Sequence, residues 1–427
     1  MLNSLKNRAY HFLRWSEKYT KTDMIYLARG GFWLTLGQGV ASVSTFFLAI
    51  AFANLLLPET YGTYKYVISI AGILTVLTLR GMDLAVFHAI ARGFEGAFLK
   101  AFKTRIKWGF LSSVASVSLG FYYYFNTNTT LATSFWIIAI FLSLMDPLEI
   151  YQSFLQGKKL FNLSAIYGSL SQVASVAILI TAVFFTNNIF ILLFAYFASW
   201  TLIRLFFFFI TIKKFPPNNN VDDKTIEYGK RTSFVNILDS LVSSVDSILI
   251  FHYLGAVNLA TYFFAIAPIS QIKNLSGHIP TLAMPKLANR ASSEINHILK
   301  KRMIYLFFLG LFISLLYILA APYIYQIFFP KYLDSVLFSQ VFSLAVALYF
   351  PQTIFGAAIS AKLTLIPPKM LYLWNLPGVI FIIFALILVI KIGIIGIIIS
   401  RLVSLVSGFA VNLIIWRRIK KNELREN

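Results

Sequence analysis

The sequence predicts an all-α polytopic membrane protein, with twelve transmembrane helices in two six-helix lobes. Three observations predict this fold class. The 427-residue chain is 58% hydrophobic and only 12% charged, about half the charge of an average soluble domain. Long apolar stretches such as "GVIFIIFALILVI" have no polar face, and ~20 apolar residues suffice to cross a ~30 Å hydrocarbon layer. Positive charge, finally, gathers in alternate loops.

The apolar stretches divide into spans separated by short polar turns. We expect them at about 25–53, 61–90, 108–125, 131–155, 161–185, 189–212, 232–254, 259–284, 303–329, 335–361, 371–390 and 393–416. With the N-terminus in the cytoplasm, about 30 of the 37 Lys and Arg residues fall on the cytoplasmic side. The net charge of +21 therefore reflects membrane topology and not nucleic-acid binding. The sequence predicts a multi-pass protein of the cytoplasmic membrane with both termini inside.

A polar linker at residues 213–231 divides the chain into two halves of six spans. The predicted domains are an interfacial segment (1–24), an N-lobe (25–212), the linker, a C-lobe (232–416) and a basic tail (417–427). Sliding the chain by about 198 residues superimposes the two halves without gaps, as expected for two repeats of the same orientation. Residues 1–24 fit either a helix on the inner leaflet or a disordered basic tail.

Several classes of chemistry find no support. The chain has no cysteine, which excludes disulfides and thiolate metal sites. It contains neither a P-loop nor an H-E-x-x-H motif, and its five histidines form no metal-like cluster. The outer loops are only a few residues long, too short for the catalytic loops of a membrane polymerase. We therefore expect no enzyme activity, no cofactor and no metal site.

The ionisable residues within the spans are the candidate functional residues, because each costs at least ~2.5–3.5 kcal/mol at mid-bilayer and usually faces protein or a wet cavity. Lys273 and Asp239 lie at equal distances from the turn near Ala256, so the sequence places them at the same depth. Two interpretations stay open. Lys273 and Asp239 form a pair that only neutralises buried charge, or Lys273 faces a central cavity and contacts an anion.

The remaining ionisable residues have several interpretations. Asp246 shares a helix face with Asp239. Arg401 lies deep in the last span and is a second candidate cavity cation. Arg80 and Asp83 fit a local i,i+3 ion pair near the cytoplasmic end of the second span. Other such residues are Arg204, which can snorkel to the inner interface, and Asp146 and Glu149, which flank Pro147 as a gate, a proton site or surface groups.

The first two spans, "RGGFWLTLGQGVASVSTFFLAIAFANLLLPETYGTYKYVISIAGILTVLTLRGMDLAVFHAIARG", resemble the opening helix pair of the polysaccharide-transport flippases. These are the O-antigen and capsule repeat-unit exporters of the multidrug/oligosaccharidyl-lipid/polysaccharide (MOP) superfamily. The segment "VDSILIFHYLGAVNLATYFFAIAPI" and the later "LAMPKLA" are similar to that family's seventh and eighth helices. Asp246, Leu254-Gly255, Tyr262 and Pro285 stand at its characteristic places.

The resemblance implies a V-shaped, MATE-like transporter with a cationic central cavity. Such a protein moves an undecaprenyl-diphosphate-linked oligosaccharide from the inner to the outer leaflet by alternating access. Lys273, Arg401 and Arg80 would then be cavity cations, with Asp239, Asp246 and Asp83 as charge partners or coupling groups. Expected partners are the lipid-linked glycan, the bilayer, H+ or Na+, and other polysaccharide-assembly proteins. The alternative is a cation-coupled drug or metabolite antiporter of the same superfamily, which would favour an anionic cavity; a membrane-embedded polymerase fits less well.

Overall fold

A computed structural model describes residues 24–222, 224–235, 237–276, 292–362, 366, 370 and 372–426, and all regular elements in these ranges are helices. The predicted segment 1–24, apart from Met24, and residues 277–284 of the predicted eighth span lie outside the described residues. The helices are, in chain order, α2 (Met24–Leu55), α3 (Pro58–Leu74), η1 (Thr75–Thr78), α4 (Met82–Ala91), α5 (Ala97–Phe125), α6 (Thr129–Leu148), α7 (Tyr151–Gly157), α8 (Phe161–Phe185), α9 (Ile189–Lys214), α10 (Lys224–Val235), α11 (Ile237–Leu254), α12 (Ala256–Ser276), α14 (Ser292–Phe328), η2 (Pro330–Tyr332), α15 (Ser335–Ser343), α16 (Ala345–Ala361), η4 (Tyr372–Asn375) and α18 (Leu376–Glu426).

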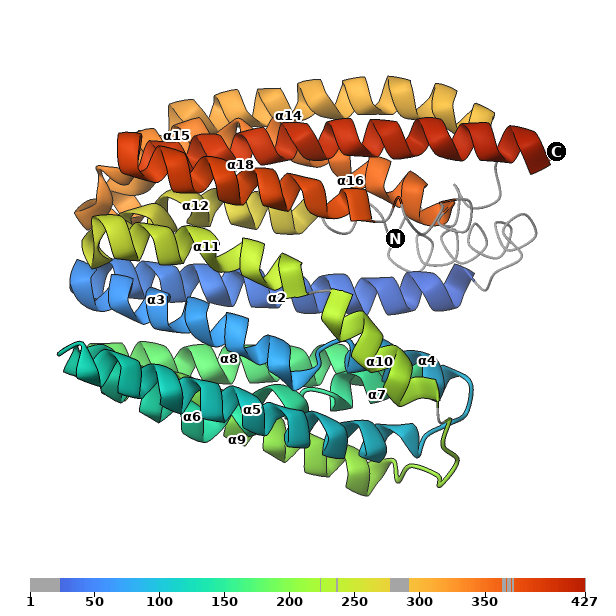
Figure 1. Ribbon diagram of the computed structural model, residues 1–427, viewed down its shortest axis with the longest axis horizontal. Helices are drawn as coiled ribbons and strands as arrows, with labels where there is room; N and C mark the ends of the chain where they lie inside the picture. Colours follow the sequence, from blue (N-terminus) through green and yellow to red (C-terminus); the bar gives the residue numbers. More distant parts are fainter. Residues whose placement is uncertain are drawn as a thin grey trace, which may run out of the picture.

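The described helices account for the twelve predicted spans. Eight are long and apolar enough to cross a membrane, or nine when the bent pair α3–η1 and α4 counts as one span. One of these, α18, contains two helices, because Ile392 and Gly393 leave helical geometry and Gly393 has a φ of 61°. Its two parts, 376–391 and 394–426, run side by side (Figure 1). Counting the bent pair as one span and α18 as two gives ten spans. The helices α5 and α12, of 29 and 21 residues, bring the total to twelve.

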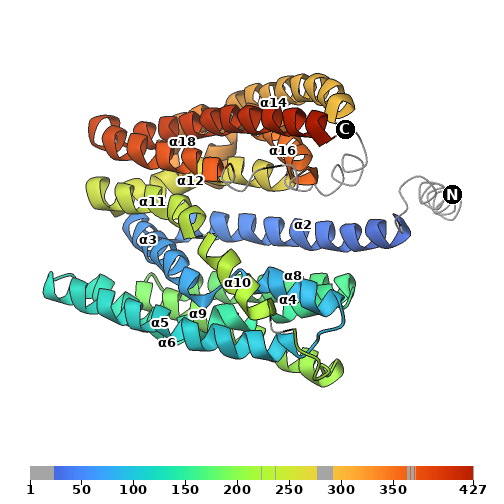
Figure 2. The same ribbon diagram turned by 45° about the vertical axis from the view of Figure 1, so that its right-hand side comes forward.

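The helices form two lobes. Figure 1 shows α3, α5, α6, α8 and α9 in one bundle and α11, α12, α14, α16 and α18 in the other. In this view and in the turned view of Figure 2, α2 lies between the two bundles. The predicted fold class, an all-helical protein of two lobes, is confirmed.

The two lobes touch where α3 packs against α11 and α12. We call the end of the molecule with the 55–58 turn the far end, and the end with residues 215–222 the linker end. Close to the far end, the ring of Tyr61 stacks on Phe264 with centroids 4.6 Å apart, and Tyr66 stacks on Phe251 at 4.0 Å. Stacked aromatic pairs contribute about 0.5–1.5 kcal/mol each beyond their burial.

Polar contacts add to this far-end contact. Asn54, at the end of α2, donates its side-chain amide to the carbonyl of Phe328 at 3.0 Å. Lys331 donates to the carbonyl of Asn54 at 2.6 Å. Lys65 of α3 places its ammonium 4.8 Å from the ring centroid of Phe263, a cation–π contact between the lobes. The sequence analysis did not single out Lys65, although it lies within the predicted second span.

The second span is broken close to α10, a helix of the seventh span. The second span bends by 47° between α3–η1 and α4, with Leu79 in the left-handed region at φ 57°. The predicted span at 61–90 is thus present as two helices that meet at this bend. The seventh span consists of α10 and α11, on either side of residue 236. α10 packs on α4 of the N-lobe, where Gly81 donates its N–H to the hydroxyl of Ser233 at 2.9 Å, whereas α11 packs on α12 and α18.

The far-end contact depends on a glycine, because a Cβ at Gly62 would overlap the carbonyl of Ala256. We expect Gly62→Val to weaken the lobe contact, since overpacking costs about 1–3 kcal/mol. The measurement is the apparent melting temperature in detergent. Gly72→Val is the matched control, because a Cβ at Gly72 on the same helix meets nothing within 4 Å. An equal change in melting temperature at the two positions would contradict the close approach of α3 and α12.

Candidate functional site

A cavity of about 380 Å³ lies between the lobes, at the break in the second span. Its lining comes from the η1–α4 region of the N-lobe and from α10 and α11, and consists of Val76, Arg80, Gly81, Ser233, Asp239, Ser240 and Ser243. Breaks in membrane helices free backbone groups from their hydrogen bonds and are tolerated where they line a cavity. Discontinuous helices at mid-membrane are also where many transporters bind their substrates.

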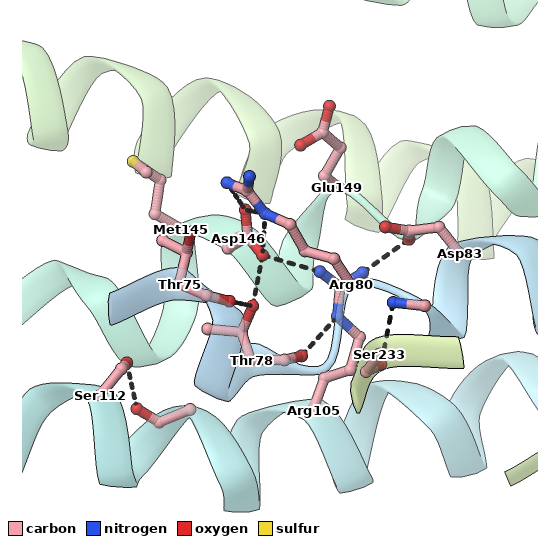
Figure 3. Close-up of polar contacts among 12 residues, drawn as sticks. Thr75, Thr78, Arg80, Asp83, Arg105, Ser112, Met145, Asp146, Glu149 and Ser233 are labelled. Carbon is pink, nitrogen blue, oxygen red and sulfur yellow. Dashed lines mark hydrogen bonds and ion pairs between the residues drawn. The ribbon is translucent and has the colours of Figure 1, made fainter. Parts of the chain in front are cut away.

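Arg80 lines this cavity and is held in place by a buried carboxylate. Its Nε and Nη2 donate to Asp146 of α6, at 3.0 and 2.8 Å to Oδ1, as Figure 3 shows. The Asp146 side chain is 2% exposed, whereas that of Arg80 is 52% exposed. Nη1 of Arg80 makes no hydrogen bond to a described residue. The carboxylate thus holds one edge of the guanidinium and leaves another edge for the cavity.

The predicted local pair between Arg80 and Asp83 is wrong. The left-handed backbone at Leu79 ends the helix before Arg80, and α4 begins only at Met82. Residues i and i+3 face each other only on a continuous helix. Arg80 therefore turns to Asp146, and Asp83 pairs with a different arginine.

That other arginine is Arg105, a residue that the sequence analysis missed. Its side chain is 1% exposed. It donates from Nε to the carbonyl of Thr78 at 3.1 Å, from Nη1 to Asp83 at 2.6 Å and from Nη2 to Asp146 at 2.9 Å (Figure 3). Thr78 also donates its hydroxyl to Asp146. The three nitrogens of one guanidinium thereby tie the second, third and fourth spans together.

Arg105 was missed because the third span was expected to begin at residue 108, whereas α5 begins at Ala97. A signal for the longer helix is present in the sequence. Ala97, Phe98, Ala101 and Arg105 recur at helical spacing and form one buried face.

A third arginine of the N-lobe also has an internal partner. Arg204 donates to Glu149 at 2.7 Å and to the carbonyl of Met145 at 2.9 Å. Its side chain is 12% exposed, and it lies 4.8 Å from the ring centroid of Trp200. The arginine is therefore held inside the lobe, and the snorkelling interpretation is wrong. Asp146 likewise is buried and is not a surface group, whereas Glu149 is 47% exposed.

The C-lobe contains a comparable arrangement around Asp246, which is buried in α11. Asp246 accepts hydrogen bonds from Nη2 of Arg401 at 2.6 Å, from the hydroxyl of Tyr262 at 2.6 Å and from the backbone N–H of Ser247 at 2.8 Å. The Arg401 guanidinium also lies 4.0 Å from the ring centroid of Phe381. These three donors satisfy the carboxylate of Asp246. Arg401 is thus held by a buried carboxylate, as Arg80 is.

Lys273 lies in α12 and Asp239 in α11. The Lys273 side chain is exposed, with its ammonium 5.0 Å from the ring centroid of Tyr349 in α16. Asp239 is exposed, lines the cavity and makes no ion pair or hydrogen bond to a described residue. Lys273 and Asp239 therefore form no ion pair with each other in the structure, and a role of either residue in binding stays a prediction.

Metal binding has no evident site in the part of the chain that the structure describes, where no three His, Cys, Asp or Glu residues gather closely enough to hold an ion.

The fold is similar to those of solved transporters. The lipid II flippase MurJ in an inward closed conformation superimposes with a TM-score of 0.67 at 14% identity, covering 92% of this chain and 90% of that one. A multidrug resistance MATE family transporter of the MOP superfamily gives a TM-score of 0.56 in its inward-facing conformation, at 15% identity, covering 89% of this chain and 96% of that chain. An outward-facing structure described in the same words gives 0.53 at 14% identity, covering 92% and 97%.

At the level of sequence, a comparison with curated proteins finds no match. The pattern of the family described as "Polysaccharide biosynthesis protein" matches residues 27–289, which include nearly all of the N-lobe and the residues that line the cavity between the lobes. The chain is thus a multi-span membrane protein with the fold of MOP superfamily transporters, and it belongs to the polysaccharide biosynthesis protein family.

Proposed function

We propose that this protein is a flippase. It moves an undecaprenyl-diphosphate-linked oligosaccharide repeat unit from the inner to the outer leaflet of the cytoplasmic membrane by alternating access. The linker end and both termini are cytoplasmic in this proposal, because most Lys and Arg residues gather on that side. The protein performs transport and no covalent chemistry.

The observation that carries the proposal is the half-exposed Arg80 in the cavity between the lobes. A diphosphate cannot cross hydrocarbon as a bare anion, because the loss of its hydration is too costly. A fixed guanidinium can replace part of that hydration with charge-assisted hydrogen bonds. Arg80 is already oriented by Asp146, so little conformational entropy is lost when a phosphate binds.

Lys273 and Arg401 extend the cationic surface on the C-lobe side. Lys273 is exposed in α12, and Arg401 keeps 23% of its side chain exposed. In the proposal these cations contact the diphosphate while the lipid tail stays in the bilayer. The far-end contact between α3 and α11–α12 closes the path on one side and must separate for release.

Asp239 is the candidate coupling residue of the flippase. It is an exposed carboxylate at the cavity, whereas Asp83 and Asp246 are held in ion pairs. A carboxylate in this position can take up H+ or accompany Na+ as the lobes move. Binding of the ion would lower the repulsion between Asp239 and the anionic substrate.

The second candidate function is a cation-coupled drug or metabolite antiporter, and one observation favours it. Asp239 is the cavity carboxylate without a partner among the described residues, whereas Arg80 already contacts Asp146. An organic cation in the cavity would bind Asp239. The two proposals thus assign the same cavity to substrates of opposite charge.

Lys273→Ala is expected to abolish export of repeat units while the protein remains in the membrane. Lys273→Arg should retain part of the activity, because charge matters more than shape for a diphosphate in a wet cavity. The measurement is surface polysaccharide in cells that carry the variant as their only copy. Normal levels with Lys273→Ala would exclude a role of this lysine in anion binding.

Arg80→Ala should weaken binding of undecaprenyl diphosphate to the purified protein by about 10-fold or more, since a hydrogen bond to a charged group contributes about 1.5–3 kcal/mol. Native mass spectrometry or a thermal-shift titration gives the Kd. Arg231→Ala is the control, because Arg231 is 78% exposed in an i,i+4 pair with Glu227. A Kd that Arg80→Ala leaves unchanged would refute the proposed contact.

Asp239→Asn separates the two candidate functions. For the flippase, removal of this negative charge should leave the Kd for undecaprenyl diphosphate unchanged or lower it. For the antiporter, the same variant should lose binding of a lipophilic cation such as tetraphenylphosphonium by about 10-fold or more. Loss of diphosphate binding in Asp239→Asn would argue against the assignment of Asp239 as a group that repels the substrate.

A further inference from the structure

A second cavity, of about 340 Å³, lies inside the N-lobe and shares no lining residue with the cavity between the lobes. Four helices contribute to it, namely α2, α7, α8 and α9. Four of the eight glutamines of the chain line it: Gln38, Gln152, Gln156 and Gln172. Amide side chains are unfavourable within membrane spans unless they have partners, so their concentration in one cavity requires an explanation.

Part of this polar lining is already organised by hydrogen bonds. The amide of Gln152 bonds with the hydroxyls of Tyr151 and Ser164. Gln156 donates to the same Ser164 hydroxyl at 3.1 Å. These bonds hold the amides in place, which is what a site for a polar ligand needs before the ligand arrives.

Other groups of the lining have hydrogen-bonding capacity to spare. Neither Gln38 of α2 nor Ser169 of α8 makes a side-chain hydrogen bond to a described residue, and both line the cavity. An amide carries two donors and an acceptor with two lone pairs, so it can match a hydroxyl group in either of its roles.

The cavity carries no net charge. Its two charged groups, Arg204 and Glu149, are paired at 2.7 Å. A free diphosphate or an organic cation would find no opposite charge to bind. Trp200 adds an aromatic ring to the wall, one side of which lies against Arg204. Amides, hydroxyls and an aromatic ring around a neutral cavity fit an uncharged molecule with many hydroxyl groups and apolar C–H faces.

The position of the cavity connects it to the proposed transport path. The segment from Asp146 to Glu149 contributes to both cavities. Asp146 holds Arg80, which lines the first cavity, and Glu149 lines the second. Figure 3 shows Glu149 pointing away from Arg105. In addition, α2, which contributes Gln38, is the helix that lies between the lobes in both ribbon views (Figures 1 and 2).

We infer that this N-lobe cavity is a sugar-binding subsite, which takes one or two uncharged pyranose rings of the lipid-linked glycan. The inference rests on the proposed flippase function and adds the chemical class of the group bound. The diphosphate contacts Arg80, and the glycan reaches past the Asp146–Glu149 segment into the amide-lined cavity. A volume of 340 Å³ falls within the usual range of ligand pockets, about 300–1,000 Å³.

The test compares two probes on the purified full chain: undecaprenyl diphosphate, and undecaprenyl diphosphate that carries a single N-acetylhexosamine. The double variant Gln38→Leu/Gln156→Leu removes amides from the cavity and keeps their approximate volume. It should weaken binding of the glycosylated probe about 10-fold and leave the Kd of the sugar-free probe unchanged. Arg80→Ala should weaken both probes.

Gln326→Leu is the matched control, because Gln326 is an exposed glutamine of α14 in the C-lobe. Equal affinity of the wild-type protein for the two probes, or an equal loss for both in the double variant, would overturn the sugar-binding subsite and leave the flippase proposal standing. A wild-type protein that binds neither probe would overturn both proposals. Gln38→Leu alone keeps the test valid if the double variant fails to fold, because Gln38 has no internal partner to lose.

Discussion

The carboxylate of Asp146 is the group on which the N-lobe depends most. It is almost fully buried, and it accepts hydrogen bonds from Thr78, Arg80 and Arg105. These donors come from two other spans, so one side chain fixes the positions of the second, third and fourth spans. An unpaired charge buried at such a site costs about 3–5 kcal/mol, so the loss of one partner would destabilise the whole network. The same network determines the direction in which Arg80 points.

The C-lobe also contains a buried carboxylate that orients an arginine. Asp246 is buried and receives Arg401 and Tyr262, which come from two further helices. In both lobes an internal carboxylate orients an arginine whose outer edge keeps some exposure. Arg80, Asp239 and Lys273 are exposed charged residues near the borders of the lobes. In the proposed transport cycle, the neutralised interiors would allow each lobe to move as a unit without exposing a bare charge to lipid.

The helices of the seventh span contact both lobes. α10 packs on α4 of the N-lobe, whereas α11 packs on α12 and α18 of the C-lobe. At the far end, the contact consists of stacked rings and a few hydrogen bonds, such as the one from Asn54 to Phe328. Each of these contacts contributes of the order of 1 kcal/mol. An interface of this kind suits the separation and closure of the lobes in the proposed transport cycle.

The sequence by itself determined the all-helical class and the twelve spans, because hydrophobic length and the position of basic loops follow directly from the properties of the bilayer. The division at the linker stays a prediction. It also identified Arg80, Asp83, Asp239, Asp246, Lys273 and Arg401 as the residues to explain, since an ionisable group within a span is costly wherever it points. Only the tertiary structure decided their partners. Arg105 and Asp146 are 41 residues apart and Asp246 and Arg401 are 155 apart, and no periodicity within one helix reports such pairs. The helix break at Leu79, which turned Arg80 away from Asp83 and toward Asp146, lies beside Gly81, where α10 approaches so closely that a Cβ would overlap the backbone of Ser233.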